Sequence, residues 1–196
     1  SDRPGYSATK IENKIGLRGM QNADIRLENV RIPVANKLPG ATSFAAANQL
    51  LMQSRAWVGW QAAGAMMATL DICKAYATQR QQFGKPLAAF QLIQQPLAEI
   101  AGNLGACLSM MCEIARKQER GKLRMEDAAM AKSTATRLAR ESAALGRATL
   151  GGNGVVSDFE MAKVFCDVEI LHTYEGTYEI NSLIVGRALT GVSAFV

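Results

Sequence analysis

Histidine and paired cysteines are almost missing from this sequence of 196 residues, and their scarcity excludes several kinds of site. His172 is the only histidine, and the four cysteines, Cys73, Cys107, Cys112 and Cys166, form no CxxC pair. Such a set cannot build a usual zinc site, and it gives no Ser-His-Asp or Cys-His arrangement. Because the cysteines lie in apolar helical sequence, we interpret them as buried thiols in a reducing compartment. No metal site is predicted.

Aromatic residues and long apolar runs are also scarce. Phe, Trp and Tyr make up 6% of the chain, whereas Ala, Gly and Met are plentiful, which favours closely packed helices over an all-β sandwich. No run of about 18 apolar residues without charge is present, so no membrane span is predicted. The chain has no initiator Met and no signal-like start, and residues 1–5 are typical of the middle of a β-region. We therefore expect a piece of a longer protein.

The formal net charge of +5 favours anionic partners only modestly, because the basic residues are spread along the chain and form no basic run. A solvated surface explains most of them. Binding of a nucleotide or of a CoA phosphate would explain a few of the basic residues. Binding of nucleic acid is a distant third interpretation of the charge.

The first 41 residues are predicted to be β structure. Apolar and polar residues nearly alternate over 25–32, with one slip at 28–29 that we interpret as a bulge. Pro33 is expected to end that strand. Residues 16–19 look like a connection between strands. The sequence therefore predicts a β-rich segment over 1–41 and a second domain over 42–196.

From Phe44 onward the apolar spacing becomes helical, and the fold class is predicted to be mainly α. Helices are expected over 44–80, from about 91 to 116 and over 125–150, with a last helix around 180–187. The pattern Ser157-Asp158-Phe159-Glu160 predicts that a short fourth helix starts with a capping box. Pro96 predicts either a kink or a helix that effectively begins near it. Short connections predict antiparallel neighbours, that is, an up-down bundle preceded by strands of a β-barrel-like domain.

The residues best placed for chemistry are Tyr174-Glu175-Gly176-Thr177, in a loop between two helices. A glycine after a carboxylate lets another molecule approach the backbone closely. Taken alone, this pattern is more typical of a surface turn before a helix.

Three motifs together change that interpretation. Leu150-Gly151-Gly152-Asn153-Gly154, the run 174–177, and Arg80-Gln81-Gln82-Phe83-Gly84 followed by Phe90-Gln91 resemble the acyl-CoA dehydrogenase family. The resemblance covers the whole chain, from the last strands of the family's middle β-domain through its C-terminal helical domain. Within the family, residues 14–18, 21–25 and 165–178 are most similar to glutaryl-CoA dehydrogenases and to plant peroxisomal short-chain acyl-CoA oxidases.

The resemblance implies an FAD-dependent α,β-dehydrogenation of a short-chain acyl-CoA thioester to a trans-2-enoyl-CoA. Glu175 corresponds to the family's base, which removes the α-proton, and the flavin accepts the β-hydrogen as hydride. In the family the thioester oxygen is held by the base residue's own backbone N–H and by a flavin hydroxyl.

The resemblance also assigns binding residues. Positions that correspond to FAD contacts are Arg80, Phe83 and Gln91, which face a neighbouring subunit's FAD, and Ala148, Thr149, Leu150, Gly151, Gly152, Thr177, Glu179 and Phe195. Positions expected to contact the substrate are Asn48, Arg55, Tyr174 and Gly176. Simpler interpretations stay open: Arg80 as a helix C-terminal cation, Phe83 as a core contact and Gly151-Gly152 as a helix stop.

Several alternatives remain open from the sequence. The electron acceptor is either an electron-transfer flavoprotein or O2, as in an acyl-CoA oxidase. A glutaryl-CoA dehydrogenase would add decarboxylation, and a nucleic-acid-binding relative without turnover is a remote third possibility. The family implies a homo-oligomer, usually a tetramer. The compartment would be the mitochondrial matrix or the peroxisome in a eukaryote and the cytoplasm in a bacterium.

Overall fold

The computed structural model describes residues 3–194, and it is mainly helical, as predicted. Within these residues the chain forms five α-helices, four short strands and four 3-10 segments, of which η3 and η4 follow one another. Their bounds are β1 Tyr6–Lys10, β2 Ala23–Leu27, η1 Val34–Asn36, α1 Phe44–Gln79, β3 Gln81–Gln82, β4 Lys85–Pro86, η2 Leu87–Ala89, α2 Gln91–Glu119, α3 Met125–Thr149, η3 Gly151–Val155, η4 Ser157–Phe159, α4 Met161–Thr173 and α5 Tyr178–Thr190.

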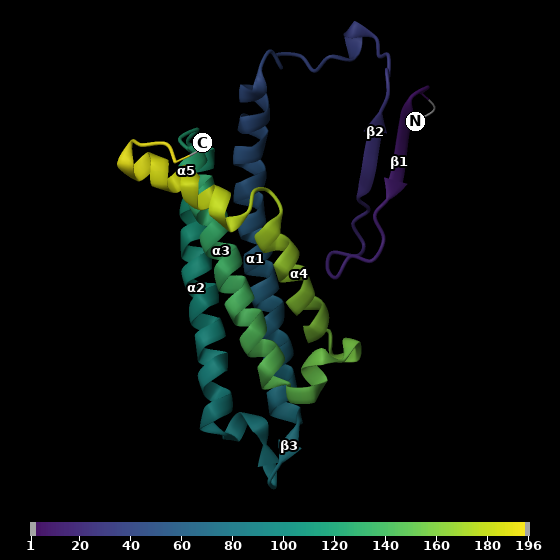
Figure 1. Ribbon diagram of the computed structural model, residues 1–196. Coiled ribbons are helices and arrows are strands. Elements are labelled where there is room, and N and C mark those ends of the chain that lie inside the picture. Colours follow the sequence, from purple (N-terminus) through teal and green to yellow (C-terminus); the bar gives the residue numbers. More distant parts are fainter. Residues whose placement is uncertain (1–2, 195–196) are drawn as a thin grey trace.

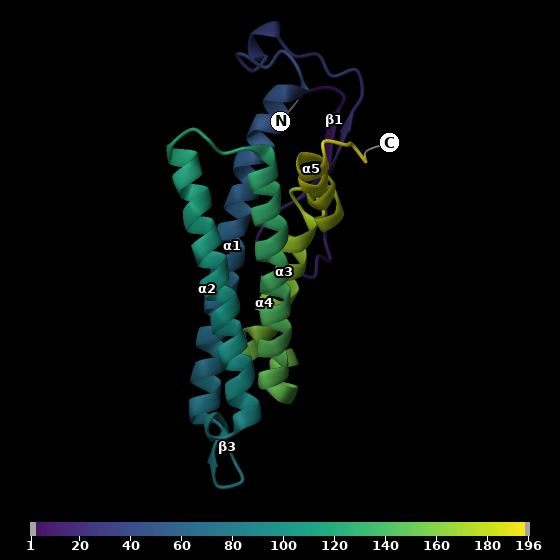
Figure 2. The ribbon, with the colours of Figure 1, turned by 90° about the vertical axis from the view of Figure 1, so that its left-hand side faces the viewer.

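The helices form the expected up-down bundle. The chain runs down α1, up α2, down α3 and up α4, and α5 then crosses the upper end (Figure 1). The central helix is α3, which packs against α1, α2, α4 and α5. Seen from the side, α1, α2 and α3 stand next to one another over most of the length of α3 (Figure 2). The position of α3 lets it reach residues of every other helix.

Small side chains on α3 allow this close packing. Ala128, Ala131, Ala135, Ala139 and Ala143 are all buried at steps of three and four, so they form one face of the helix. Larger side chains fill the space opposite them, and the buried ones are Met66, Ile100, Met111, Met161 and Val168. An alanine face brings the helix axes close together, so each neighbour on that face must fit closely.

The first strands stand apart from the bundle. β1 pairs with β2 in antiparallel register, with Tyr6 opposite Leu27, and the two strands stand on the α4 side of the bundle, separated from it (Figure 1). The loop between the strands docks on α4, where the N–H of Leu17 donates to the Asp167 carboxylate at 2.6 Å. The boundary at residue 41, and the assignment of these strands to a β-barrel-like domain, stay predictions.

Two local predictions are wrong, and a third is narrowed. The second strand ends at Leu27 and does not continue as a bulge, because Asn29 adopts a left-handed conformation with φ of 52°. No α-helix starts at Ser157: residues 157–159 form a 3-10 turn, Glu160 is left-handed, and α4 begins at Met161. Of the two alternatives for Pro96, a helix that begins near the proline is excluded, because α2 begins at Gln91 and passes through Pro96, and the kink stays a prediction.

The thiols are partly as predicted. All four cysteines are free, and burial raises the pKa of Cys73 and of Cys107 to about 11, so both are protonated at neutral pH. Cys112 is exposed, which contradicts its prediction as a buried thiol, because it lies on the outer face of α2. Among the described helices only α2 is long and apolar enough to span a membrane, a test that core helices also pass.

A pair of glycines tests the close packing of α3. A Cβ at Gly146 would lie 2.6 Å from Thr69 Cγ2 and 2.9 Å from Met161 Sδ, whereas one at Gly102 on α2 would meet nothing within 4 Å. Both Gly→Ala changes gain about 1 kcal/mol of helix propensity. We expect Gly146→Ala to be less stable than Gly102→Ala by about 1–3 kcal/mol, the cost of overpacking. Urea unfolding of both variants measures this difference, and equal midpoints would contradict it.

Candidate functional site

The turn between α4 and α5 carries Glu175 in a strained conformation. Glu175 has φ of 56° and Gly176 has φ of 86°, so both lie in the left-handed region. For a residue with a side chain this conformation costs about 1–3 kcal/mol, and it persists only where the surroundings impose it. The contacts around the turn therefore indicate what holds Glu175 in place.

Helix α1 holds Glu175 through two adjacent residues. Arg55 Nε donates to the Glu175 carbonyl oxygen at 3.1 Å, and Ser54 Oγ donates to the Glu175 carboxylate at 2.6 Å. Arg55 is only 6% exposed, and burial lowers its pKa, an effect that the negative charge of Glu175 opposes. A Cβ at Gly176 would lie 3.2 Å from Arg55 Nη2, so the turn has little room for a side chain there.

Helix α3 contributes a lysine to the same turn. Lys132 is fully buried, and its Nζ donates to the carbonyl oxygens of His172 and Gly176, each at 2.7 Å. Asn181 of α5 donates to the Gly176 carbonyl as well, at 2.8 Å, and to Thr177 O at 3.0 Å. Lys132 therefore ties the end of α4 to the turn, and Asn181 ties α5 to the same carbonyl group.

The environment of Lys132 lowers the pKa of its ammonium group. Burial and the nearby positive charge of Arg55 lower the pKa of Lys132 to about 8, while Glu175 and Glu179 oppose the shift. No carboxylate lies within ion-pair distance of Lys132 in the part of the chain that the structure describes, so the two carbonyl groups are its partners. Backbone carbonyls compensate a buried charge less completely than a carboxylate does.

Sequence reasoning did not find Lys132, Ser54 or Asn181. One feature of the sequence could have drawn attention to Lys132. It lies in the middle of the alanine-rich face of α3, where only small apolar residues are expected. A lysine at such a position either faces solvent or has a buried partner. Nothing in the sequence marks Ser54 or Asn181, since both are ordinary helix residues.

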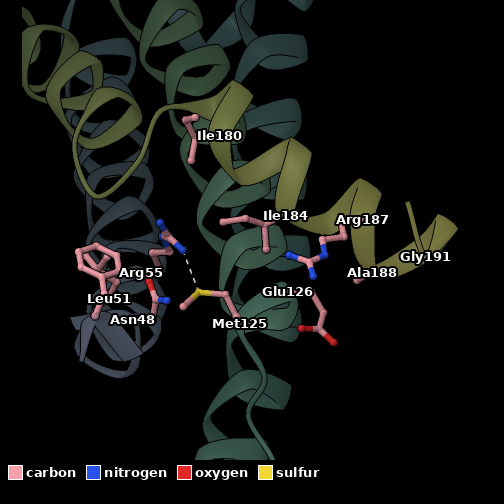
Figure 3. Close-up of a pocket in the computed structure, with 11 residues that line it drawn as sticks. Asn48, Leu51, Arg55, Met125, Glu126, Ile180, Ile184, Arg187, Ala188 and Gly191 are labelled. Atoms are coloured by element: carbon pink, nitrogen blue, oxygen red, sulfur yellow. Dashed lines mark hydrogen bonds between the residues drawn. The ribbon is translucent and has the colours of Figure 1, made fainter. Parts of the chain in front are cut away.

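A groove lies next to the turn. It has a volume of about 710 Å³, and its walls come from the first half of α1, the start of α3 and α5 (Figure 3). Asn48 and Arg55, two of the four predicted substrate contacts, line it, and Arg55 also holds Glu175. Tyr174 and Gly176 do not line it. Tyr174 turns its hydroxyl to Gln61 on α1, and burial followed by the charge of Glu175 raises its pKa.

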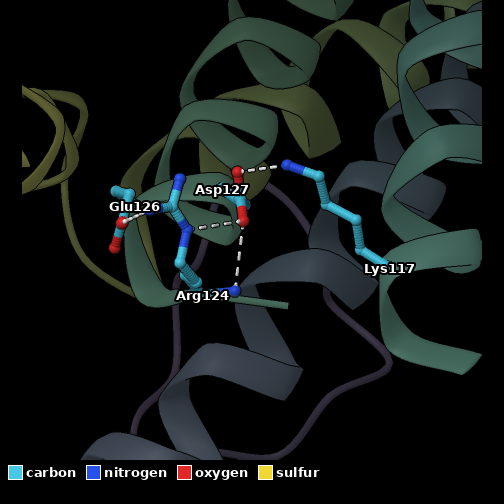
Figure 4. Close-up of polar contacts among 4 residues, drawn as sticks. All are labelled: Lys117, Arg124, Glu126 and Asp127. Atoms are coloured by element: carbon cyan, nitrogen blue, oxygen red, sulfur yellow. Dashed lines mark hydrogen bonds and ion pairs between the residues drawn. The ribbon is translucent and has the colours of Figure 1, made fainter. Parts of the chain in front are cut away.

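A network of charged residues fixes the start of α3, which forms one wall of the groove. The Asp127 carboxylate accepts from Lys117 Nζ at 2.6 Å and from the N–H of Arg124 at 3.2 Å (Figure 4). Arg124 also pairs with Glu126, a groove residue, at 3.1 Å. Burial alone would raise the pKa of Asp127, but the contacts with Lys117 and Arg124 outweigh burial and lower it.

Most of the predicted cofactor residues gather at the opposite end of the bundle. A hollow of about 310 Å³ there is lined by Arg80 together with Ala148, Thr149, Leu150, Gly151 and Gly152. Phe83 is 91% exposed at the tip of the β3–β4 hairpin, which excludes a core contact, and its ring meets that of Phe90 edge-on. Gln91 is exposed at the first turn of α2.

The remaining predicted cofactor residues lie with Glu175. Thr177 caps α5 by accepting from the N–H of Ile180, and Glu179 is exposed in its first turn. Thr149 lies seventeen positions after Lys132 on α3, about 26 Å along the helix. The predicted residues therefore form two separate places, one at each end of the bundle. Phe195 lies outside the described residues.

Comparisons with known proteins show which family the sequence and the fold resemble. A family model described as acyl-CoA dehydrogenase, C-terminal domain, matches residues 44–190. The short-chain specific acyl-CoA dehydrogenase of Megasphaera elsdenii is 33% identical over 187 residues, 95% of this chain and 49% of that protein. The acryloyl-CoA reductase (NADH) of Anaerotignum propionicum is 34% identical over 185 residues, 94% of this chain and 47% of that protein.

Solved structures with a similar fold include acyl-CoA dehydrogenases. A glutaryl-CoA dehydrogenase from Mycobacterium smegmatis has a TM-score of 0.95 at 36% identity, and a glutaryl-CoA dehydrogenase from the same organism in complex with FADH2 has 0.96 at 33%. Each comparison covers 100% of this chain and 50% of the other. The chain thus spans about half the length of the relatives that it matches.

Replacing the buried lysine tests its role. We expect Lys132→Met to lower the free energy of unfolding at pH 7 by about 2–4 kcal/mol, because two buried carbonyls lose their charged donor. Lys74→Met, at an exposed position of α1, is the matched control and should change stability by less than about 0.5 kcal/mol. Similar urea midpoints for the two variants would show that Lys132 does not hold the turn.

The lowered pKa of Lys132 gives a pH dependence of known sign. The pKa of Lys132 is about 8 in the folded protein and about 10.4 in the unfolded chain. Between these two pH values the unfolded state therefore binds more protons than the folded state. The contribution of Lys132 to stability must therefore rise with pH across this window. We expect the stability of the wild type relative to Lys132→Met to increase by about 1–3 kcal/mol from pH 7 to pH 10. A difference that stays constant or falls would refute the assignment.

Proposed function

The chain belongs to the acyl-CoA dehydrogenase family, and we propose that it carries the catalytic base of a flavin-dependent α,β-dehydrogenation of an acyl-CoA thioester. One observation carries the proposal: the Glu175 carboxylate stands on a left-handed turn that groups from α1, α3 and α5 hold in place. A strained and multiply supported carboxylate is typical of a functional position.

The turn suits proton abstraction next to a thioester. In the proposed reaction the Glu175 carboxylate takes the α-proton of the substrate as a general base. Negative charge then develops on the thioester oxygen. Within residues 3–194 the backbone N–H of Glu175 has no hydrogen-bond acceptor, so it is available to donate to that oxygen. Arg55 and Lys132 hold the neighbouring carbonyls and keep the turn from rotating.

The residues present fit an FAD. Arg80 brings a positive charge to the hollow at the far end, and Gly151 and Gly152 leave the backbone there uncovered, which suits phosphate groups. When bound, the flavin accepts the β-hydrogen as hydride. Since about 26 Å of α3 separates the hollow from the turn, we propose that the two places serve two different FAD molecules. This arrangement requires a homo-oligomer, for which we propose a tetramer.

For the substrate we propose a short-chain acyl-CoA, converted to its trans-2-enoyl-CoA. The similarity to the short-chain specific dehydrogenase of M. elsdenii and to the acryloyl-CoA reductase supports a small acyl group. Glutaryl-CoA, with decarboxylation, is the second candidate, and it is supported by the similarity to the two M. smegmatis structures. We propose an electron-transfer flavoprotein as the acceptor, and peroxide release under air would instead indicate an oxidase.

Replacing the base tests the proposal. In the FAD-loaded protein we expect Glu175→Gln to slow bleaching of the flavin absorbance by short acyl-CoA, without oxygen, by about 10²–10⁴-fold. The reason is that a neutral amide cannot accept the α-proton. Glu119→Gln, an exposed position at the end of α2, is the control and should bleach like the wild type. Undiminished bleaching in Glu175→Gln, with flavin still bound, would remove Glu175 as the base.

A further inference from the structure

Ser54 makes the one described side-chain contact to the Glu175 carboxylate. Its Oγ lies 2.6 Å from Glu175 Oε2 and 3.2 Å from the carbonyl oxygen of Leu51, one turn earlier on α1. No other side chain among residues 3–194 hydrogen bonds or ion pairs with this carboxylate. Ser54 is therefore the residue that decides where the carboxylate points.

The backbone of the turn is fixed independently of Ser54. Arg55 holds the Glu175 carbonyl, and Lys132 and Asn181 hold the Gly176 carbonyl. With the backbone fixed, the remaining freedom of Glu175 lies in its side-chain torsions. A single hydrogen bond at the carboxylate removes most of that freedom, because it ties the last group of the side chain to a rigid helix.

The two neighbours of the hydroxyl suggest how it responds to proton transfer. A serine hydroxyl has one proton to donate and two lone pairs to accept with. While Glu175 is ionised, the hydroxyl must donate to it, because a carboxylate only accepts. Once Glu175 is protonated, its O–H can donate to Ser54 Oγ, provided that the serine proton has another acceptor. The Leu51 carbonyl lies within reach to be that acceptor.

We propose that Ser54 is a positioning residue for Glu175, serving the base in both of its protonation states through rotation of one hydroxyl. The inference rests on the proposed function of Glu175. In the ionised state the serine proton points to Glu175, and after the α-proton has moved to Glu175 it points to Leu51. No proton is gained or lost by Ser54, and the carboxyl group keeps its place throughout.

Removing the hydroxyl tests this role. In the FAD-loaded protein we expect Ser54→Ala to lower kcat about tenfold, the size of one hydrogen bond to a charged group, with little change in KM. The acid limb of the kcat–pH profile should move to higher pH, because the ionised carboxylate loses a donor. Ser54→Thr keeps the hydroxyl and, on a helix, its bond to the preceding turn, so it should restore both quantities.

A matched control separates this effect from a general loss of helix stability. Ser109 of α2 is exposed, and its hydroxyl donates to the Gly105 carbonyl oxygen at 2.9 Å, four residues earlier, much as Ser54 reaches Leu51 three residues earlier. Ser109→Ala should leave kcat and the pH profile unchanged. If Ser54→Ala lost its flavin, Ser54→Cys would keep the size and weaken the donor, and it should show the same shift.

The outcomes distinguish a failure of the Ser54 inference from a failure of the proposed role of Glu175 as base. If Glu175→Gln stops flavin reduction but Ser54→Ala keeps the wild-type kcat and acid limb, Ser54 has no positioning role and Glu175 remains the base. If Ser54→Thr is as impaired as Ser54→Ala, the hydroxyl is not the cause and the inference is wrong. If Glu175→Gln reduces its flavin at the wild-type rate, both the base and its positioning residue are refuted.

Discussion

The ammonium group of Lys132 is the contact on which the geometry of the turn depends. It reaches the last residues of α4 through His172 O and the turn itself through Gly176 O. Burying the charge of this lysine, with only carbonyl groups as partners, costs free energy, and the lowered pKa of Lys132 reflects that cost. The fold offsets this cost by close packing of the alanine-rich face of α3, on which the lysine stands. The core of the bundle and the turn are thus stabilised by neighbouring positions of one helix.

The strain in Glu175 follows from the same arrangement. A left-handed residue would relax if its carbonyl were free, but Arg55 holds the carbonyl of Glu175 and Lys132 holds the next one. These two cations come from different helices, α1 and α3, so neither helix can shift without breaking a contact to the turn. The network at Asp127 then fixes the start of α3 relative to the end of α2. The position of one carboxylate is consequently set by the packing of the whole bundle.

Sequence reasoning predicted the helices well because their signals are local. The stripe of apolar residues along α2 can be read within a few turns of chain. The role of Glu175 stays a prediction, and it came from three motifs together, because the pattern around Glu175 alone indicates only a surface turn. Sequence reasoning failed where a contact between residues far apart in the chain decides the local structure. Lys132 is buried because two carbonyls from residues 172 and 176 meet it, and no pattern near residue 132 records them. The capping box at Ser157 failed because Glu160 takes a left-handed conformation, so it cannot reach back over a helical turn.

The two places where the predicted cofactor residues gather lie at opposite ends of the bundle, and this separation limits which residues can orient Glu175. Arg80 and Gly151 lie at the end of the bundle that is farthest from Glu175, so they cannot help to orient its carboxylate directly. Within one chain the turn and the far hollow are linked along the length of the bundle by α1 and α3, and also by α4, which leads from η3 and η4 to the turn. In the proposed oligomer, a shift of α3 along its axis would therefore change the base of one flavin site and the phosphate contacts of another. Close packing of the alanine-rich face against its neighbours resists that shift, so in the proposed oligomer the small side chains of α3 would keep the two flavin sites in register.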